Sequence, residues 1–315
     1  MICTRMRQLF LATVLCLFMP ALAAQPLPVV ASFSILADMV REVGGPHVEV
    51  TSLVGPNTDS HVFDPTPADA KRIASARLVF VNGLGFEGWL DRLVKASGYR
   101  GPIVIASKGV KTPLQLKDAH QHTGPTKGQG AHHAHGVSDP HAWQNLANAE
   151  RYVETIRLAL AAALPAHSAV FEQRAADYSK RIRALEQATK AQIAAVPAER
   201  RRVITSHDAF GYFAAAYGVT FYPLQGLATA NEPSAAEVVR IVDQIKKNKV
   251  SAIFTENISD PRVLERIAKD SGAKVGGRLY ADALTEPGTA ADTYLKMFER
   301  NVATIVQGMA GNASQ

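Results

Sequence analysis

Short apolar runs alternate with amphipathic stretches along the first half of the chain. Runs rich in Val, Ile, Leu and Phe predict strands at 28–33, 48–54, 78–82 and 103–106. Helical spacing of apolar residues predicts helices at 35–43, 67–76, 88–97 and 146–164. This alternation of strands and helices favours a parallel sheet flanked by helices.

A long stretch without Gly or Pro separates this half from the next. Residues 166–195 carry apolar side chains at helical spacing, which predicts one helix roughly 45 Å long at 1.5 Å per residue. A helical hairpin with an unmarked turn is the alternative. The alternation then restarts, with strands at 202–205, 219–224, 252–256 and 274–277 and helices at 208–217, 234–248, 260–271 and 289–308. The expected fold class is α/β, with two similar lobes, each a parallel sheet flanked by helices, joined by one long rigid helix.

The first 24 residues have the pattern of a secretory signal peptide. Arg5 and Arg7 form a basic start, an apolar run follows at 9–19, and Ala21-Leu22-Ala23 is a small-x-small cleavage site. The run is shorter than the ~20 residues that span a membrane, and the residues before Cys16 do not fit a lipoprotein signal. We therefore expect export to the periplasm. The expected organisation is a signal peptide at 1–24, an N-terminal lobe at 25–165, a linking helix at 166–196 and a C-terminal lobe at 197–315.

Loss of this segment changes what the composition implies. The 315-residue chain has 10 His, two Cys and a formal charge of +6. Both cysteines and two arginines leave with the leader, so the charge falls to +4 and any metal site must use His and carboxylates. The remaining basic residues are scattered, which argues against a nucleic-acid binder. The GxGxxG match at 83–88 follows the third strand and lacks an acid about twenty residues on, so it predicts a turn rather than a dinucleotide site.

Three histidines lie in turns where such a fold places its ligands. His61 lies between a strand and a helix, His207 directly follows the strand at 202–205, and His141 lies in a Pro-rich turn before a helix. Ligands bind at the carboxyl ends of strands in open α/β sheets, so the two lobes would share a site in the cleft between them. Zinc takes four ligands, and the loop after the last strand offers Asp282 as the fourth. The competing carboxylates are Glu286, Asp208 and Glu256.

Five further histidines lie in one segment. Residues 117–137 are rich in Gly and His and have no apolar periodicity, which predicts a mobile loop. Its histidines are candidate auxiliary zinc ligands: His120, His122, His132, His133 and His135.

Several motifs resemble the metal-specific solute-binding proteins of bacterial ABC importers, the zinc and manganese group (cluster A-I). The matching stretches are SHVFDPTPAD (60–69), NGLGFEGWL (82–90), DPHAW (139–143), SHDAFGYF (206–213), the long helix and 279–284. The resemblance covers nearly the whole mature chain and implies metal ligands at His61, His141, His207 and Asp282, the four that chain position also indicates. In that family a His at the third position goes with zinc and a Glu with manganese, so His207 implies zinc.

The resemblance implies a zinc-binding protein of the ZnuA/TroA/AztC-like kind. Such a protein is a monomer that captures Zn²⁺ and delivers it to a membrane permease with a separate ATPase, with a periplasmic zinc chaperone as a further candidate partner. A closed site of four protein ligands argues for capture, because catalytic zinc keeps an open position. The alternatives are a manganese or iron carrier of the same fold and a zinc-dependent hydrolase. Carboxylates expected to orient the imidazoles are Asp64, Asp139 and Asp208.

Overall fold

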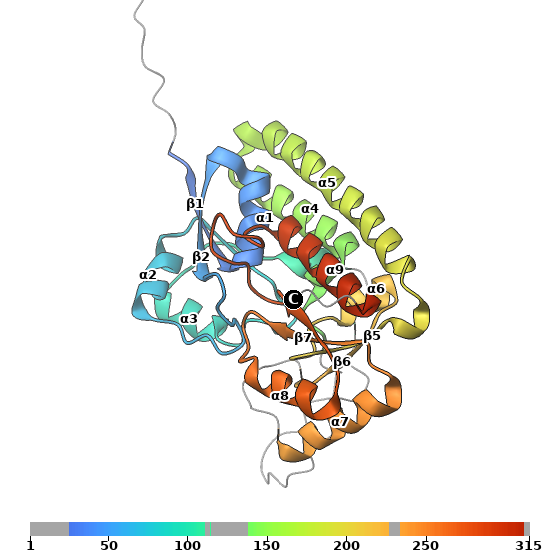
Figure 1. Cartoon of the computed structure of the whole chain (residues 1–315). Coiled ribbons are helices and arrows are strands. Elements are labelled where there is room, and N and C mark those ends of the chain that lie inside the picture. Colours follow the sequence, from blue (N-terminus) through green and yellow to red (C-terminus); the bar gives the residue numbers. More distant parts are fainter. Residues whose placement is uncertain (1–24, 111–113, 115–137, 227–233, 312–315) are drawn as a thin grey trace, which may run out of the picture.

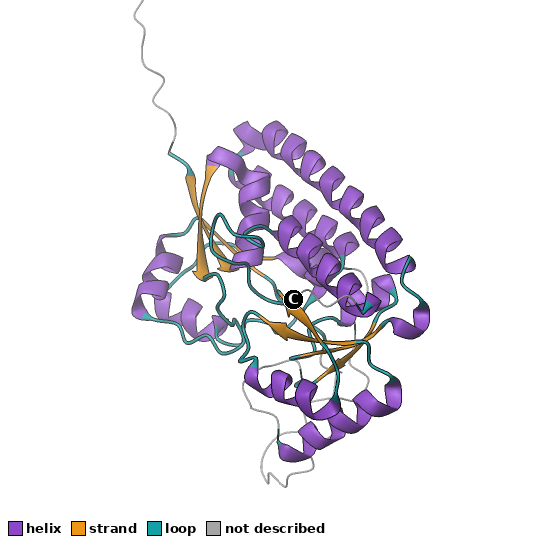
Figure 2. Ribbon diagram, in the orientation of Figure 1, coloured by secondary structure: helices purple, strands orange, loops and turns teal. Residues whose placement is uncertain are grey.

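Two parallel four-stranded sheets form the framework, one in each half of the chain (Figures 1 and 2). The first sheet has the order β2-β1-β3-β4, with β1 Leu27–Phe33, β2 Val48–Val54, β3 Leu78–Val81 and β4 Ile103–Ile105. The second has the order β6-β5-β7-β8, with β5 Arg202–Thr205, β6 Thr220–Pro223, β7 Ala252–Glu256 and β8 Val275–Leu279. Strand order is the same in both halves, and the expected α/β fold of two similar lobes is confirmed.

The computed structural model describes residues 25–110, 114, 138–226 and 234–311. The expected signal peptide and the His-rich segment, with its five histidines, lie outside these residues. Within the described part of the chain, no helix is long and apolar enough to span a membrane.

Helices cover both faces of each sheet. Those of the first half are α1 Ser34–Gly44, α2 Pro67–Ser75, α3 Leu90–Ser97 and α4 Leu146–Ala163. Those of the second half are α6 Gly211–Tyr217, α7 Ala235–Asn248, α8 Arg262–Ser271 and α9 Tyr294–Ala310. Side chains alternate along β5, so Ile204 packs under α7 and α8, while Val203 joins the larger core that contains α6 and α9.

A single helix, α5 (Ser168–Ala194), runs along both halves (Figure 1). It packs on α1 and α4 of the first half and on α6 and α9 of the second. Its buried side chains include Phe171, Tyr178 and Ile193, spread from one end to the other. At 1.5 Å per residue its length is about 40 Å. The prediction of one continuous helix is therefore confirmed, and the hairpin alternative is wrong.

Several predicted boundaries differ from the structure near the second sheet. The helix expected at 208–217 begins only at Gly211, because the amides of His207 and Asp208 are hydrogen-bonded to Glu256 and to the Gly226 carbonyl in a non-helical turn. The helix expected at 289–308 begins at Tyr294, after Thr293 caps its amino end. The last strand, expected at 274–277, is β8 at Val275–Leu279.

Candidate metal centre

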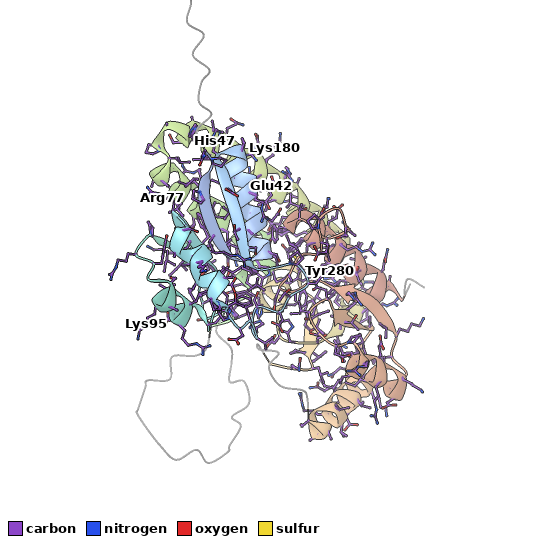
Figure 3. The ribbon with its side chains drawn as sticks, turned by 90° about the vertical axis from the view of Figure 1, so that its left-hand side faces the viewer. Glu42, His47, Arg77, Lys95, Lys180 and Tyr280 are labelled. Atoms are coloured by element: carbon purple, nitrogen blue, oxygen red, sulfur yellow. The ribbon has the colours of Figure 1, made fainter. Side chains whose placement is uncertain are left out.

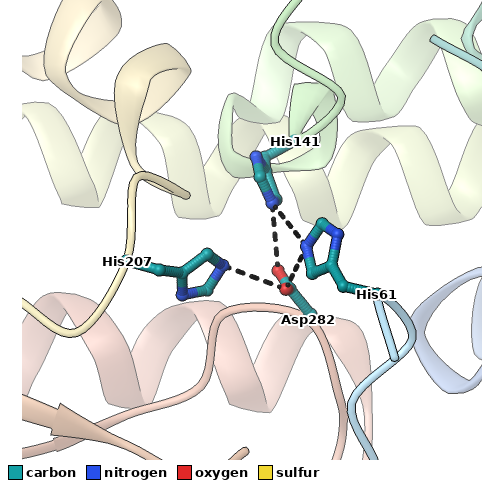
Figure 4. A group of neighbouring side chains, drawn as sticks. All are labelled: His61, His141, His207 and Asp282. Atoms are coloured by element: carbon teal, nitrogen blue, oxygen red, sulfur yellow. Dashed lines mark hydrogen bonds and ion pairs between the residues drawn. The ribbon is translucent and has the colours of Figure 1, made fainter. Parts of the chain in front are cut away.

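The four predicted ligand residues converge at one point between the sheets (Figure 4). One ligand atom from each of His61, His141, His207 and Asp282 lies within 4.8 Å of all the others. Asp282 Oδ2 is 3.1 Å from both His61 Nε2 and His207 Nε2, and Asp282 Oδ1 is 3.6 Å from His141 Nε2. His141, His207 and Asp282 are fully buried, and His61 is half-buried. The group can hold a metal ion through three imidazole nitrogens and a carboxylate.

The carboxyl ends of the strands place these side chains, as the parallel topology predicts. His207 is the second residue after β5, and Asp282 is the third residue after β8. His61 lies in the loop that leaves β2, and His141 precedes the short 3₁₀ helix Ala142–Gln144 that leads into α4. In each sheet, this edge is where open α/β folds bind ligands.

Two of the imidazoles are oriented by buried carboxylates. Asp139 accepts from His141 Nδ1 at 2.8 Å and from the His141 amide at 2.9 Å. Glu256 lies 2.5 Å from His207 Nδ1 and also accepts from the amides of Ser206 and His207. A carboxylate on Nδ1 keeps the proton there, so Nε2 presents its lone pair to a metal.

His61 is held differently. Its amide donates to Asp59 Oδ1 at 2.8 Å, and its ring lies edge-on to Phe86, 5.0 Å between centroids. The loop just before it is held by Trp89, whose Nε1 donates to the Ser60 carbonyl at 3.0 Å. His61 is thus positioned through its backbone and by aromatic packing.

Sequence reasoning identified only part of this supporting structure. Asp139 orients an imidazole as expected, but no hydrogen bond joins Asp64 or Asp208 to an imidazole in the part of the chain that the structure describes. Glu256, considered as a ligand, instead lies behind His207, and Glu286 is exposed. The signal for Glu256 was its place at the end of β7, directly beside β5 in the sheet.

Burial and neighbouring charges shift the pKa values of His207 and Asp282 in opposite directions. Burial lowers the pKa of His207, but the carboxylates of Glu256 and Asp282 outweigh burial and raise it well above its ordinary value. Burial would raise the pKa of Asp282, but the charges of His141 and His207 and hydrogen bonds from His207 and His61 hold it well below its ordinary value. A divalent cation would therefore displace a proton from this group.

One carboxylate oxygen fits a cation better than a hydrogen bond. Asp282 Oδ1 is buried and has no hydrogen-bond donor among the described residues. A buried carboxylate oxygen without a donor is costly, and a coordinated metal would satisfy it. A cavity of about 980 Å³ lies mainly against α7 and α8, and its lining also includes Asp59, Val62 and Ser206, which are near His61 and His207 in the sequence.

The fold of two paired lobes agrees with comparisons to known proteins. Residues 29–308 match the ZnuA family, described as zinc-uptake complex component A, periplasmic. The chain is 30% identical over 289 residues to the iron-binding protein YfeA of Yersinia pestis, covering 92% of this chain and 88% of the relative. It is 30% identical over 292 residues to the manganese-binding lipoprotein MntA of Bacillus subtilis, covering 91% of each.

Solved structures show the same architecture. The periplasmic zinc-binding protein TroA of Treponema pallidum superposes with a TM-score of 0.81 at 29% identity, covering 90% of this chain and 99% of that one. The Mn-bound periplasmic metal-binding protein of Candidatus Liberibacter asiaticus gives a TM-score of 0.75 at 30% identity, covering 89% and 98%. The ZnuA family consists of solute-binding transport proteins rather than enzymes. With the match extending over both lobes and the long helix between them, the chain belongs to the ZnuA family of metal-binding periplasmic components of ABC importers.

Proposed function

We propose that this protein captures Zn²⁺ in the periplasm and delivers it to the permease of a zinc importer. The observation that carries the proposal is the donor set, in which three imidazole Nε2 atoms and one carboxylate converge in a group that is buried apart from the half-buried His61. Imidazole nitrogen suits zinc, and four protein ligands match its tetrahedral preference. With no fourth position left for water, such a site would hold and release the ion rather than use it in catalysis.

A manganese or iron carrier of the same fold is the second candidate. It is favoured by the names of two relatives, one iron-binding and one manganese-binding, at 30% identity. Manganese prefers carboxylate and other oxygen ligands, and Asp282 is the only carboxylate within the proposed ligand set. His207 is therefore the residue on which the choice of metal depends. His207→Glu should shift the preference from zinc toward manganese.

Competitive metal titration of the purified, metal-free protein tests the proposal. Zinc should displace manganese, and His61→Ala and Asp282→Ala should each weaken zinc binding at least tenfold. His47→Ala is the matched control, because Figure 3 shows His47 far from Tyr280, where the loop to Asp282 begins. Tight manganese binding with weak zinc binding would overturn the proposed metal. Unchanged zinc affinity in His61→Ala would overturn the proposed ligand set.

The remaining parts of the proposal concern export and partners. Residues 1–24 would direct export and be removed, and the loaded monomer would dock on a permease that works with a separate ATPase. A periplasmic chaperone could supply the metal, and the histidines at 117–137 would collect zinc for the buried group. Deleting 118–136 should then slow zinc loading. An unchanged loading rate with unchanged stoichiometry would remove that role from the segment.

A further inference from the structure

The loop that carries Asp282 is tied to the opposite half of the molecule. The carbonyl of Ala281, the residue just before Asp282, accepts two hydrogen bonds from the first half. Trp143 Nε1 donates at 2.9 Å and Gln144 Nε2 at 2.8 Å, and both side chains are fully buried. Both donors lie in the 3₁₀ helix that directly follows His141. One short segment, from His141 to Gln144, therefore supplies one proposed ligand and fixes the backbone next to another, Asp282. Gln144 and Ala281 are 137 residues apart along the chain.

The far end of the same loop is also tied to the first half. The Leu284 amide donates to Ser34 Oγ at 3.0 Å, and the Leu284 carbonyl accepts from the Asn57 amide at 2.8 Å. Asp282 is therefore bracketed by hydrogen bonds to the half that carries His61 and His141. The loop is also bound within its own half, by Asn301 at Tyr280 and by Asn257 at the Ala283 carbonyl. His207 is held through Glu256 at the end of β7, in the second sheet.

Gln144 is an unexpected side chain at its position. Its Oε1 is buried and has no hydrogen-bond partner among the described residues, which costs free energy of folding. The Ala281 carbonyl would stay satisfied by Trp143 alone. An apolar side chain of the same size would fill the space without a stranded oxygen, so folding alone does not favour Gln144. A role in folding therefore does not explain why Gln144 Nε2 donates to the Ala281 carbonyl.

We propose that Gln144, together with Trp143, is a positioning residue for metal capture. It holds the Ala281 carbonyl so that the Asp282 carboxylate keeps its place relative to His61 and His141. Three of the four proposed ligands then form one preset group on the first half, and His207 completes it from the second sheet. This inference rests on the proposed function, because it assigns Asp282 a metal to bind.

Gln144→Met in the full chain tests the inference, since Met matches Gln in length and donates no hydrogen bond. Zinc affinity, measured by chelator competition, should fall about tenfold, the lower end of the range for groups that orient metal ligands. The visible absorption of the Co²⁺-loaded protein should change, because it reports the geometry of the ligands. The melting temperature of the metal-free protein should be unchanged or higher, because the variant lacks the buried, unpartnered Oε1 of Gln144.

Two further variants separate positioning from a general structural effect. Gln244→Met, in α7, removes an amide whose Oε1 is likewise buried without a partner in the described chain, and it should leave zinc affinity unchanged. Trp143→Phe removes the second donor to Ala281 but keeps a ring against Phe33. It should weaken zinc binding by a similar factor, and it keeps the test open if Gln144→Met does not fold.

A double-mutant cycle with Asp282→Ala decides the outcome. If Gln144 acts through Asp282, Gln144→Met should cost no further affinity once Asp282 is Ala. The same tenfold loss in both backgrounds, or no loss in the single variant, would overturn the positioning role. If Asp282→Ala alone leaves zinc affinity unchanged, the proposed ligand set fails instead, so the two failures are distinguishable.

Discussion

Replacing Glu256 with Gln tests how strongly the buried carboxylate behind His207 supports metal binding. Glu256 accepts three hydrogen bonds, from the Ser206 amide at 2.9 Å, the His207 amide at 3.2 Å and His207 Nδ1 at 2.5 Å. A Gln side chain has a single acceptor oxygen. It can face the two amides or the imidazole, but not both.

Each orientation of the amide has a cost. With its oxygen on the backbone amides, Gln places an NH₂ group against His207 Nδ1, which moves the imidazole proton to Nε2, the atom proposed to bind metal. With its oxygen on the imidazole, the NH₂ group faces two buried amides and leaves them unsatisfied, at about 1–3 kcal/mol each. Loss of such a supporting group costs 10- to 100-fold in metal affinity, and here we expect about 100-fold, or about 2.7 kcal/mol.

Zinc affinity of Glu256→Gln is best measured by chelator competition at pH 7, with circular dichroism to show that the fold is intact. Glu265→Gln is the matched control, because it removes the same charge from an exposed position in α8. Asp139→Asn, which changes the carboxylate on His141, should weaken binding in the same way. A folded Glu256→Gln protein with zinc affinity within twofold of the parent would refute this reasoning.

Three further predictions concern stability. Burial, aided by the nearby charges of Glu42 and Asp292, raises the pKa of Asp38 from 3.8 to about 6 despite its hydrogen bond from an amide. Between these two pH values the folded state holds a proton that the unfolded state has lost. The stability of the fold therefore falls by about 3 kcal/mol as pH rises from about 4 to above 6. Asp38→Asn should remove that fall in urea unfolding curves measured across this range, and parallel curves for both proteins would contradict it. Tyr152→Phe should lower the free energy of unfolding in urea by about 1–3 kcal/mol, because the Tyr152 hydroxyl donates to the buried Asn82 Oδ1 at 2.6 Å. Phe171→Ala should lower stability by about 3–5 kcal/mol, since this side chain of α5 is fully buried in the core. A change in the melting temperature of only a degree or two would count against this packing.

The strand ends of the site could be predicted from the sequence because topology alone determines them. Apolar runs indicate strands, and parallel pairing brings their carboxyl ends to one edge, so His207 and Asp282 could be placed without coordinates. The role of Glu256 could not, because its side-chain direction depends on the register of β7, which shifts between Ile253 and Phe254 in its pairing with β8. A carboxylate at that edge can bind a metal or a histidine, and the sequence does not distinguish the two.

Contacts between the lobes could not be predicted from the sequence pattern either. The periodicity of 166–195 predicts a long helix, but it does not say what packs on each end. Gln144 directly follows the DPHAW motif (139–143), and nothing in the local sequence indicates that its amide reaches Ala281 in the other half. Such contacts depend on how the two sheets are oriented relative to each other, which local propensity does not determine.

The way α9 is embedded in the molecule has a consequence for folding. Although it is the last helix, its side chains Met297 and Phe298 belong to the same continuous core as β1 and α1, and Asp38 of α1 accepts a hydrogen bond from the first amide of α9. A fragment ending at residue 196 would lose this part of its interior and expose the apolar side chains that α9 covers. The two lobes should therefore melt in one cooperative transition, and neither should be obtainable as an isolated soluble domain.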